Sequence, residues 1–344
     1  MERGHHHIRT LVNVGRTVLE LAGEATPIID EQFMAGAARV AEQGGFFTVI
    51  DQANLIGEKR PDAIKHDMAL LPPNPYSNKE IDDTLWLIDV MLGSDQAAEV
   101  LSIFSKEASK LRLFERIKST PEKPGEKLLV VSNHLNLPDQ GFTMGFLHKA
   151  AAKEEVDRLE HHLTVVVGRL IGYFNLDKSN VVDDVLRKVG SVLKTFPNGG
   201  SESLTEDQQQ VLSVFRRVCN HYTKQAFGNL IDSRTGQIIC MAPSGEEDKF
   251  DPNAGMIRMR KFSEGTNELM IEACKKGARI VPAFVDYGSD ASIVEFLPEC
   301  SVNSQEDCHE IGRAIAAMGS YAHAEAKQQH QQVERFNYPI AYGA

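Results

Sequence analysis

The sequence predicts an α/β fold, in which a helical N-terminal domain precedes a domain built on a mixed, largely parallel sheet. Two observations lead to this prediction. From residue 17 to about residue 114, apolar residues recur at helical spacings with almost no strand-like run. From residue 127 onward, short apolar runs alternate with longer segments of helical periodicity, which is the pattern of a sheet with covering helices. The expected domains are residues 1–118 and 119–344.

The helical domain carries recognisable helix starts and breaks. A proline-rich stretch, Pro72–Pro75, interrupts it. Ser77 then stands three residues before Glu80, a capping-box pattern that opens a helix with its apolar residues on one face. The stretch Ser119–Gly125 holds two prolines and a glycine and is the best candidate for a linker. No constellation of catalytic groups stands out in residues 1–118, so we expect a helical bundle that packs on the rest.

The second domain contains four strand-like runs. They are Lys127–Ser132, Leu163–Val167, Ile238–Met241 and Ala278–Val285. Buried parallel strands read as continuous apolar runs, so these four are predicted to share one sheet. Helices are expected at 141–153, 205–227 and 263–276, and Gly277 ends the last of them. The segment 181–193 is expected to be mostly helical, and the tail at 323–330 to be a solvated helix.

Composition excludes several classes of function. The chain has 37 Lys and Arg against 48 Asp and Glu, a net charge of −11, so no nucleic-acid partner is expected. No run approaches the roughly 18 apolar residues of a membrane span, so the expected location is cytoplasmic. The five cysteines form no CxxC pair, which predicts reduced thiols and no metal site.

One candidate acid–base pair stands at the end of the first strand-like run. Lys127–Ser132 leads into Asn133 and His134, and Asp139 follows five residues after His134, at the mouth of the expected helix. A carboxylate that reaches the imidazole Nδ1–H fixes the tautomer and leaves Nε2 as a base. Such a pair takes a proton from a substrate hydroxyl. The alternative is that Asp139 only caps the helix and His134 is a surface histidine, and the spacing alone weighs the two equally.

A second polar turn follows the run Ile238–Met241. It reads Ala242-Pro243-Ser244-Gly245 and continues into charged residues. In a parallel sheet both turns fall at the carboxyl ends of strands, where ligands bind. The hydroxyl and the neighbouring amides of this turn can hold an anion, whereas the plain alternative is an ordinary loop. Because both turns can face one cleft, the two signals reinforce each other.

Together these motifs resemble the ordered motif set of the glycerolipid acyltransferases. The set is Asn133-His134 with Asp139, then the Ala-Pro-Ser-Gly turn at 242–245, then the run Ile280–Ala283. The sequence is most similar to the soluble, plastid-type glycerol-3-phosphate acyltransferase branch, which carries Ala-Pro-Ser-Gly where most relatives have Pro-Glu-Gly. Leu163–Gly168 is similar to the strand that follows the first motif there. The resemblance covers about residues 127–330, and a helical N-terminal domain is in keeping with it.

The resemblance implies a reaction and a role for each matched residue. A fatty acyl group would pass from acyl-carrier protein (acyl-ACP) or acyl-CoA to the sn-1 hydroxyl of glycerol 3-phosphate. His134 would be the general base on that hydroxyl, and Asp139 would orient it. Ser244 and Gly245 would shape the acceptor or phosphate end of the cleft. No covalent acyl-enzyme is implied, so no cysteine takes part. The thioester is a co-substrate, and no further cofactor is implied. The plastid-type branch also implies the plastid stroma as a location if a transit peptide has been removed.

The charged residues after the turn depart from the pattern of that branch. There the turn continues with a glycine and two arginines flanking an aspartate, whereas here it reads Glu246-Glu247-Asp248-Lys249. A glutamate beside a phosphate costs electrostatic energy, because like charges repel strongly in a partly dry site. Compensating charge can come from Lys249 and from four further basic residues, although for any one of the four a solvated surface position is the favoured interpretation. These four are Lys194, Arg258, Arg260 and Lys261.

Several functional alternatives stay open. The acceptor is glycerol 3-phosphate, or else a lysophospholipid or another hydroxyl compound. A non-catalytic relative would bind a lipid or an acyl carrier without turnover, and a thioesterase-like hydrolase would use water in place of the acceptor. The expected partners are an acyl-carrier protein or coenzyme A thioester and a small phosphorylated polyol, with peripheral contact to a membrane that receives the lipid product.

Overall fold

The computed structural model describes residues 70–73, 111–135, 143, 147, 158–168, 186–187, 189–195, 220, 223–287, 292–329 and 338–343. The chain separates into two compact units of discontinuous segments. The larger unit comprises Pro72–Val167, Asp184–Val192 and Gly228–Ala344, and the smaller comprises Met1–Leu71, Gly168–Asp183 and Leu193–Phe227. Most of the expected helical domain, residues 1–118, lies outside the described residues. Its structure and its boundary therefore stay predictions.

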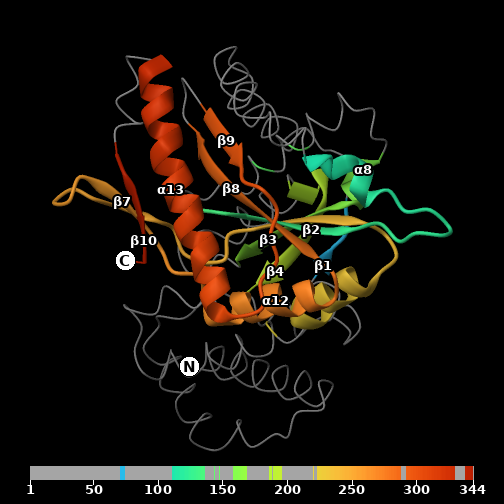
Figure 1. Cartoon of the computed structure of the whole chain (residues 1–344). Coiled ribbons are helices and arrows are strands. Elements are labelled where there is room, and N and C mark those ends of the chain that lie inside the picture. Colours follow the sequence, from blue (N-terminus) through green and yellow to red (C-terminus); the bar gives the residue numbers. More distant parts are fainter. Residues whose placement is uncertain are drawn as a thin grey trace, which may run out of the picture. The chain divides into compact units, whose positions relative to one another are not determined.

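A mixed sheet forms the centre of the larger unit (Figure 1). β2 pairs in parallel with β5 on one side and β8 on the other, β3 pairs in parallel with β5, and β9 runs antiparallel to β8 at the edge. The sheet is therefore largely parallel, which confirms the predicted α/β class. The spatial order of these strands is β3 (Leu163–Gly168), β5 (Gln237–Met241), β2 (Lys127–Ser132), β8 (Arg279–Tyr287) and β9 (Ser292–Phe296).

The central strands are apolar in their middle because both faces of the sheet are covered, and the polar residues Lys127, Ser132 and Gln237 stand only at strand ends. Every residue of β2 and of β5 is buried. Parallel strands covered on both faces carry no polar alternation, which is why the sequence marks them as continuous runs. All four predicted runs are strands, and the first has the predicted bounds. β3 and β8 extend beyond their predicted carboxyl ends, by one and two residues.

One prediction about secondary structure needs correction, and another holds in part. Residues 186, 187 and 189 are helical as expected, but a strand, β4 (Ser191–Thr195), begins within the segment predicted to be helical. Val192 and Leu193 are fully buried there, so burial decides the conformation of this short apolar run. The tail after residue 323 is helical as predicted, and Ala324, Lys327 and Gln328 are exposed. Its other face is buried with Ala326, and His323 is 1% exposed. Its Nε2 lies 3.0 Å from an Asp286 oxygen, which keeps this polar ring satisfied in the core.

A second sheet of three short strands was not predicted. It consists of β6 (Lys249–Asp251), β7 (Met256–Met259) and β10 (Ile340–Tyr342). β6 and β7 form an antiparallel hairpin, and β10, from the carboxyl-terminal end of the chain, lies parallel to β7. Figure 1 shows the hairpin as the gold ribbon that projects beyond α13. The hairpin begins where the loop after β5 ends, and that loop carries the Ala-Pro-Ser-Gly turn at 242–245.

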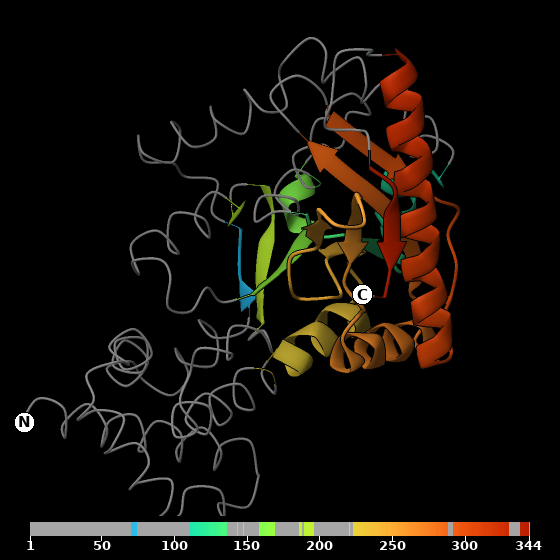
Figure 2. The same cartoon turned by 90° about the vertical axis from the view of Figure 1, so that its left-hand side faces the viewer.

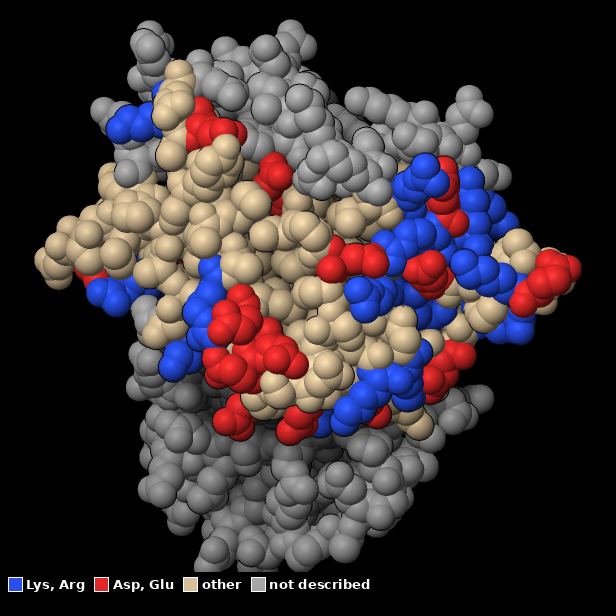
Figure 3. All heavy atoms as spheres, in the orientation of Figure 1, with Lys and Arg blue, Asp and Glu red and all other residues tan. Residues whose placement is uncertain are grey.

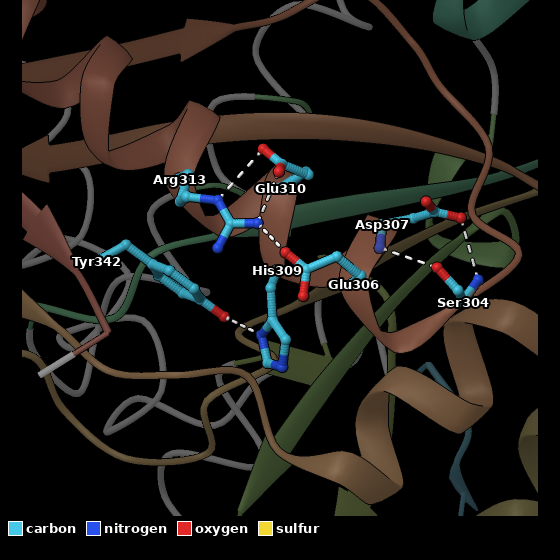
Figure 4. Close-up of polar contacts among 7 residues, drawn as sticks. All are labelled: Ser304, Glu306, Asp307, His309, Glu310, Arg313 and Tyr342. Atoms are coloured by element: carbon cyan, nitrogen blue, oxygen red, sulfur yellow. Dashed lines mark hydrogen bonds and ion pairs between the residues drawn. The ribbon is translucent and has the colours of Figure 1, made fainter.

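Two helices cover the sheet and begin at well-formed caps. In α12 (Glu264–Lys275), the Ser263 hydroxyl accepts a hydrogen bond from the Thr266 amide. In α13 (Gln305–Gln329), the Asp307 carboxylate accepts the Ser304 amide while the Ser304 hydroxyl accepts the Asp307 amide, a capping box seen in Figure 4. α13 packs against β8, β9 and β10, as the turned view shows (Figure 2).

The remaining described elements are short. They are β1 (Leu70–Leu71), α8 (Leu113–Ile117) and the 3-10 turn η1 (Leu159–His161). Residue 220 and residues 223–232 are also helical. This agrees with the helix predicted at 205–227 and extends five residues beyond its predicted end. No helix within the described residues is both long and apolar enough to cross a membrane.

Charged side chains of both signs intermingle over α8 and the loop that follows it (Figure 3). The guanidinium of Arg116 forms ion pairs with Glu126 and with Glu299. Arg279 also lies 3.6 Å from Glu299, and Lys276 pairs with Asp232 at 2.7 Å. Burial lowers the pKa of Arg116 and its two carboxylate partners raise it, with a net rise. The pairs of Arg116 and Arg279 link α8 to the amino ends of β2 and β8.

Candidate functional site

The two polar turns predicted from the sequence follow neighbouring strands. β2 pairs with β5 in parallel, with Val131 opposite Met241, so both strands end at the same edge of the sheet. The turn after β2 begins with Asn133, which is 2% exposed. Its side-chain amide donates to the Val285 carbonyl at 2.7 Å and accepts from the Val285 amide at 2.8 Å. Asn133 therefore attaches this turn to β8 by two hydrogen bonds.

His134 contacts the second turn through its backbone. The His134 amide donates to an Asp248 carboxylate oxygen at 2.9 Å, and the Asp248 amide donates to the His134 carbonyl at 2.6 Å. These two residues are 114 positions apart in the sequence. The pair of bonds shows that the two polar turns meet, which the sequence analysis expected only from their places at strand ends. The His134 residue is half-buried.

Asp248 also contacts a third segment, the link between β7 and α12. Its other carboxylate oxygen accepts a hydrogen bond from the Arg260 amide at 2.8 Å. Three residues further on, the Ser263 amide donates to the Pro243 carbonyl at 3.0 Å. Asp248 is itself only 7% exposed. We call His134, Asp248 and the Arg260 backbone the three-segment clasp, because they join the ends of β2, β5 and β7.

The Ala-Pro-Ser-Gly turn is closed by its own hydrogen bonds. The Gly245 amide donates to the Ala242 carbonyl at 3.2 Å, and the Ser244 hydroxyl donates to the Glu246 carbonyl at 2.9 Å. Gly245 has a φ of +67°, in the left-handed region that favours glycine. Ser244 and Gly245 therefore shape the turn that carries Asp248 toward His134.

Two of the predicted cations near this turn, Arg260 and Arg258, lie close to a carboxylate. The Arg260 guanidinium is 3.7 Å from Glu246, and both side chains are about one-third or more exposed, at 34% and 41%. The Arg258 guanidinium pairs with Asp251 at 2.7 Å within the β6–β7 hairpin. Hydrogen bonding from Arg258 is the main cause that lowers the pKa of the Asp251 carboxyl. The local positive charge is therefore partly neutralised in the structure.

Two more predicted basic residues have different surroundings. Lys249 is exposed at the start of β6 and stands directly opposite Arg258 in the hairpin. Lys194 is 7% exposed in β4, where its carbonyl accepts a hydrogen bond from the Thr223 hydroxyl. Lys194 belongs to the smaller unit, whereas the clasp belongs to the larger one. The structure brings Lys249, Arg258 and Arg260 together on one hairpin and its continuation.

The predicted partner of His134 is not described by the structure. Asp139 lies outside the described residues, so the acid–base pair stays a prediction. In the helix expected over 141–153, Thr143 and Leu147 are described, and both are helical and buried. Their spacing of four places them on one face of that helix.

Three of the four described cysteines have the properties of structural thiols. All four are free: Cys240, Cys274, Cys300 and Cys308. Burial raises the pKa of Cys240, and it raises the pKa of Cys300 to about 11 and that of Cys308 to about 12. Because the thiolate is the nucleophilic form, these three thiols are poor nucleophiles at neutral pH. Among the described residues, no group of three or more His, Cys, Asp or Glu side chains is placed to hold a metal ion.

Sequence analysis did not identify two residues that hold the site. Asp248 stands where the resemblance places an aspartate between two arginines, and that match was the available signal. Asn133 precedes His134 in the first motif, but its bond to β8 depends on a strand about 150 residues away, at a separation of 152. Neither role follows from local sequence, because both depend on which strands become neighbours.

Comparisons with known proteins add no family to this description. The chain matches none of the protein-family models searched, and a search of curated proteins finds no match either. The functional reading consequently rests on the two turns, their contacts and the motifs that they carry.

Proposed function

We propose that this protein is an O-acyltransferase that moves a fatty acyl group from acyl-ACP or acyl-CoA to the sn-1 hydroxyl of glycerol 3-phosphate. The single observation that carries the proposal is the pair of hydrogen bonds between the His134 backbone and Asp248, one accepted by the Asp248 carboxylate and one donated by the Asp248 amide. It brings the histidine motif and the Ala-Pro-Ser-Gly loop, the two motifs most specific to the acyltransferase resemblance, to one edge of a parallel sheet. Ligands of such sheets bind at this edge.

The proposed chemistry needs one base and no covalent intermediate on the protein. His134 accepts the proton of the acceptor hydroxyl through Nε2 as the hydroxyl oxygen attacks the thioester carbonyl. The new C–O bond forms, and collapse of the tetrahedral species breaks the C–S bond. The thiolate leaves and takes the proton back from the imidazolium. Asp139 is proposed to orient the ring through Nδ1–H, as in the histidine–aspartate half of a hydrolase triad.

The state of the described cysteines agrees with direct transfer. A ping-pong route through an acyl-enzyme would need an activated thiol or hydroxyl. Burial raises the pKa values of Cys240, Cys300 and Cys308, so none of these three is activated. Direct attack by the acceptor is therefore the route that we propose.

The acceptor end of the site is assigned to Ser244, Gly245, Lys249, Arg258 and Arg260. Arg260 is the best placed to bind a phosphate among the described cations, because its backbone is held by the clasp that also holds His134. A phosphate would have to compete with Glu246, 3.7 Å from that guanidinium. This competition favours a lysophospholipid or another hydroxyl acceptor as the second candidate, because an extended acceptor contributes apolar contacts that do not depend on Arg260.

The test is acyl transfer by the full-length protein to glycerol 3-phosphate, measured with acyl-CoA and acyl-ACP in parallel. We expect His134→Ala to lower kcat by at least about 100-fold, because general-base catalysis contributes about 10²–10⁴-fold. His161→Ala is the matched control, since His161 is an exposed histidine on η1 and should leave the rate unchanged.

The outcomes separate the alternatives. Full activity in His134→Ala would contradict the proposed role of the histidine. Release of fatty acid at equal rates with and without acceptor would identify a thioesterase. Transfer to lysophospholipid but not to glycerol 3-phosphate would replace the acceptor and keep the reaction. Thioester binding without turnover on any acceptor would identify a binding protein.

A further inference from the structure

We infer that Asp248 is the positioning residue of the proposed base, an inference that rests on the proposed function of His134. Asp248 binds the His134 backbone on both sides of the residue and binds the Arg260 backbone at the same time. It thereby sets the place of the base relative to the cation that we assign to the acceptor.

The contacts of the carboxylate are specific to this role. One oxygen accepts the His134 amide at 2.9 Å and the other accepts the Arg260 amide at 2.8 Å. The Asp248 amide donates to the His134 carbonyl at 2.6 Å. A carboxylate is required for this arrangement, because both oxygens must accept. An asparagine has one acceptor oxygen, and its NH2 group would face the second backbone N–H.

The other side of His134 is already attached to the sheet. Asn133 makes two hydrogen bonds to Val285 of β8, and Asp248 supplies the link on the β5 side. The turn is therefore held from both neighbouring strands. Loss of the Asp248 link leaves Asn133 in place, so the sheet should keep its register while His134 gains freedom to move. A misplacement of about 1 Å can cost about 100-fold in rate.

Asp307 offers a matched control. Its carboxylate also accepts two backbone amides, from Asn303 at 2.7 Å and from Ser304 at 3.0 Å. It caps α13 and has no contact with the clasp among the contacts described. Both amides bind the same oxygen, so an asparagine can keep these bonds. Asp307→Asn therefore controls for the loss of one negative charge at a place that does not hold His134.

The experiment compares Asp248→Asn, Asp307→Asn and the wild type as full-length proteins. Selective ¹⁵N-histidine labelling follows the ring of His134 by NMR through a pH titration, with His134→Gln to identify its signals. Steady-state transfer gives kcat and the KM for the acyl donor. In Asp248→Asn we expect kcat to fall about 10- to 100-fold with the donor KM within about twofold, and the His134 titration to move. Asp307→Asn should change neither.

The outcomes decide between positioning and general stability. Wild-type kcat together with an unmoved His134 titration in Asp248→Asn would overturn the inference. Equal changes in Asp248→Asn and Asp307→Asn would also overturn it, because the effect would then be one of stability. If Asp248→Asn does not fold, Asp248→Ser removes the carboxylate without placing an NH2 group against a backbone N–H, and an unchanged kcat and titration in that variant would overturn it too.

The two proposals fail in different ways. A wild type that transfers to no acceptor contradicts the proposed function. A His134 ring titration that still moves in Asp248→Asn upholds the positioning role in that case. In an active wild type, a kcat and a His134 titration that both survive Asp248→Asn unchanged contradict the positioning role alone.

Discussion

Single residues near the clasp set the charge that an acceptor would meet. Glu246 lies 3.7 Å from Arg260, with both side chains partly exposed. Exposed ion pairs contribute about 0.2–1 kcal/mol. A phosphate must displace that carboxylate or share the cation with it. If the proposed function holds, Glu246→Gln should lower the KM for glycerol 3-phosphate by about two- to fivefold with kcat unchanged, which steady-state kinetics would measure.

Glu247 provides the control for that residue-scale prediction. It is an exposed carboxylate in the same turn, with no ion pair among the contacts described. Glu247→Gln makes the same change in net charge without removing a partner from Arg260, so its effect on KM should be smaller and should vanish in high salt. Identical KM values for Glu246→Gln and the wild type would show that Arg260 does not bind the acceptor.

At the scale of elements, α13 depends on two glycines where strands and side chains approach it closely. A Cβ on Gly319 would lie 2.5 Å from the Phe284 ring and 2.6 Å from Ile340. A Cβ on Gly312 would lie 2.2 Å from the Tyr342 ring. The hydroxyl of that ring is hydrogen-bonded to Nδ1 of His309 (Figure 4). Gly319→Ala should therefore lower the free energy of unfolding by about 1–3 kcal/mol, measured by urea denaturation.

Gly228 is the matched control for this packing prediction. It is also helical, and a Cβ there would meet nothing within 4 Å. Gly228→Ala should be neutral or stabilise the protein by up to about 1 kcal/mol, because alanine loses less backbone entropy in a helix. Equal unfolding free energies for the two variants would contradict the close packing of α13 on β8 and β10.

At the scale of the whole molecule, half-buried and exposed carboxylates make stability depend on pH. The pKa of Asp307 is lowered chiefly by the Asn303 amide, that of Glu310 by Arg313, and that of Asp251 by Arg258. A carboxyl whose pKa is lower in the folded protein stabilises the fold above its ordinary pKa, which is about 4. This stabilisation is lost as the pH falls through the folded-state value.

Asp307→Asn tests this pH dependence. The variant lacks one such carboxyl, so its urea midpoint should lie below that of the wild type at pH 7. The difference should shrink as the pH is lowered from about 5 toward 3, because the wild-type carboxyl then becomes protonated as well. The measurement is a series of urea denaturation curves for both proteins. A difference that is constant over the whole pH range would mean that the charge of Asp307 does not stabilise the protein.

Local sequence was enough to predict the α/β class, four strands of the central sheet and the start of α12. Each of these depends on burial or capping within a few neighbouring residues, which the order of apolar and polar residues records directly. It also singled out His134 and the turn at 242–245 as polar segments at strand ends. The role of His134, its partner Asp139 and the acyl transfer reaction stay proposals.

Which segments meet became known only from the tertiary structure. The strands β6, β7 and β10 are three or four residues long, and β10 pairs with β7 from about 80 residues away in the sequence, as in the pairing of Ile340 with Ile257. Runs this short carry little periodicity, so long-range pairing selects their conformation. The link between His134 and Asp248 likewise spans 114 positions. It exists because β2 and β5 become neighbours in the sheet, and no local pattern encodes that choice.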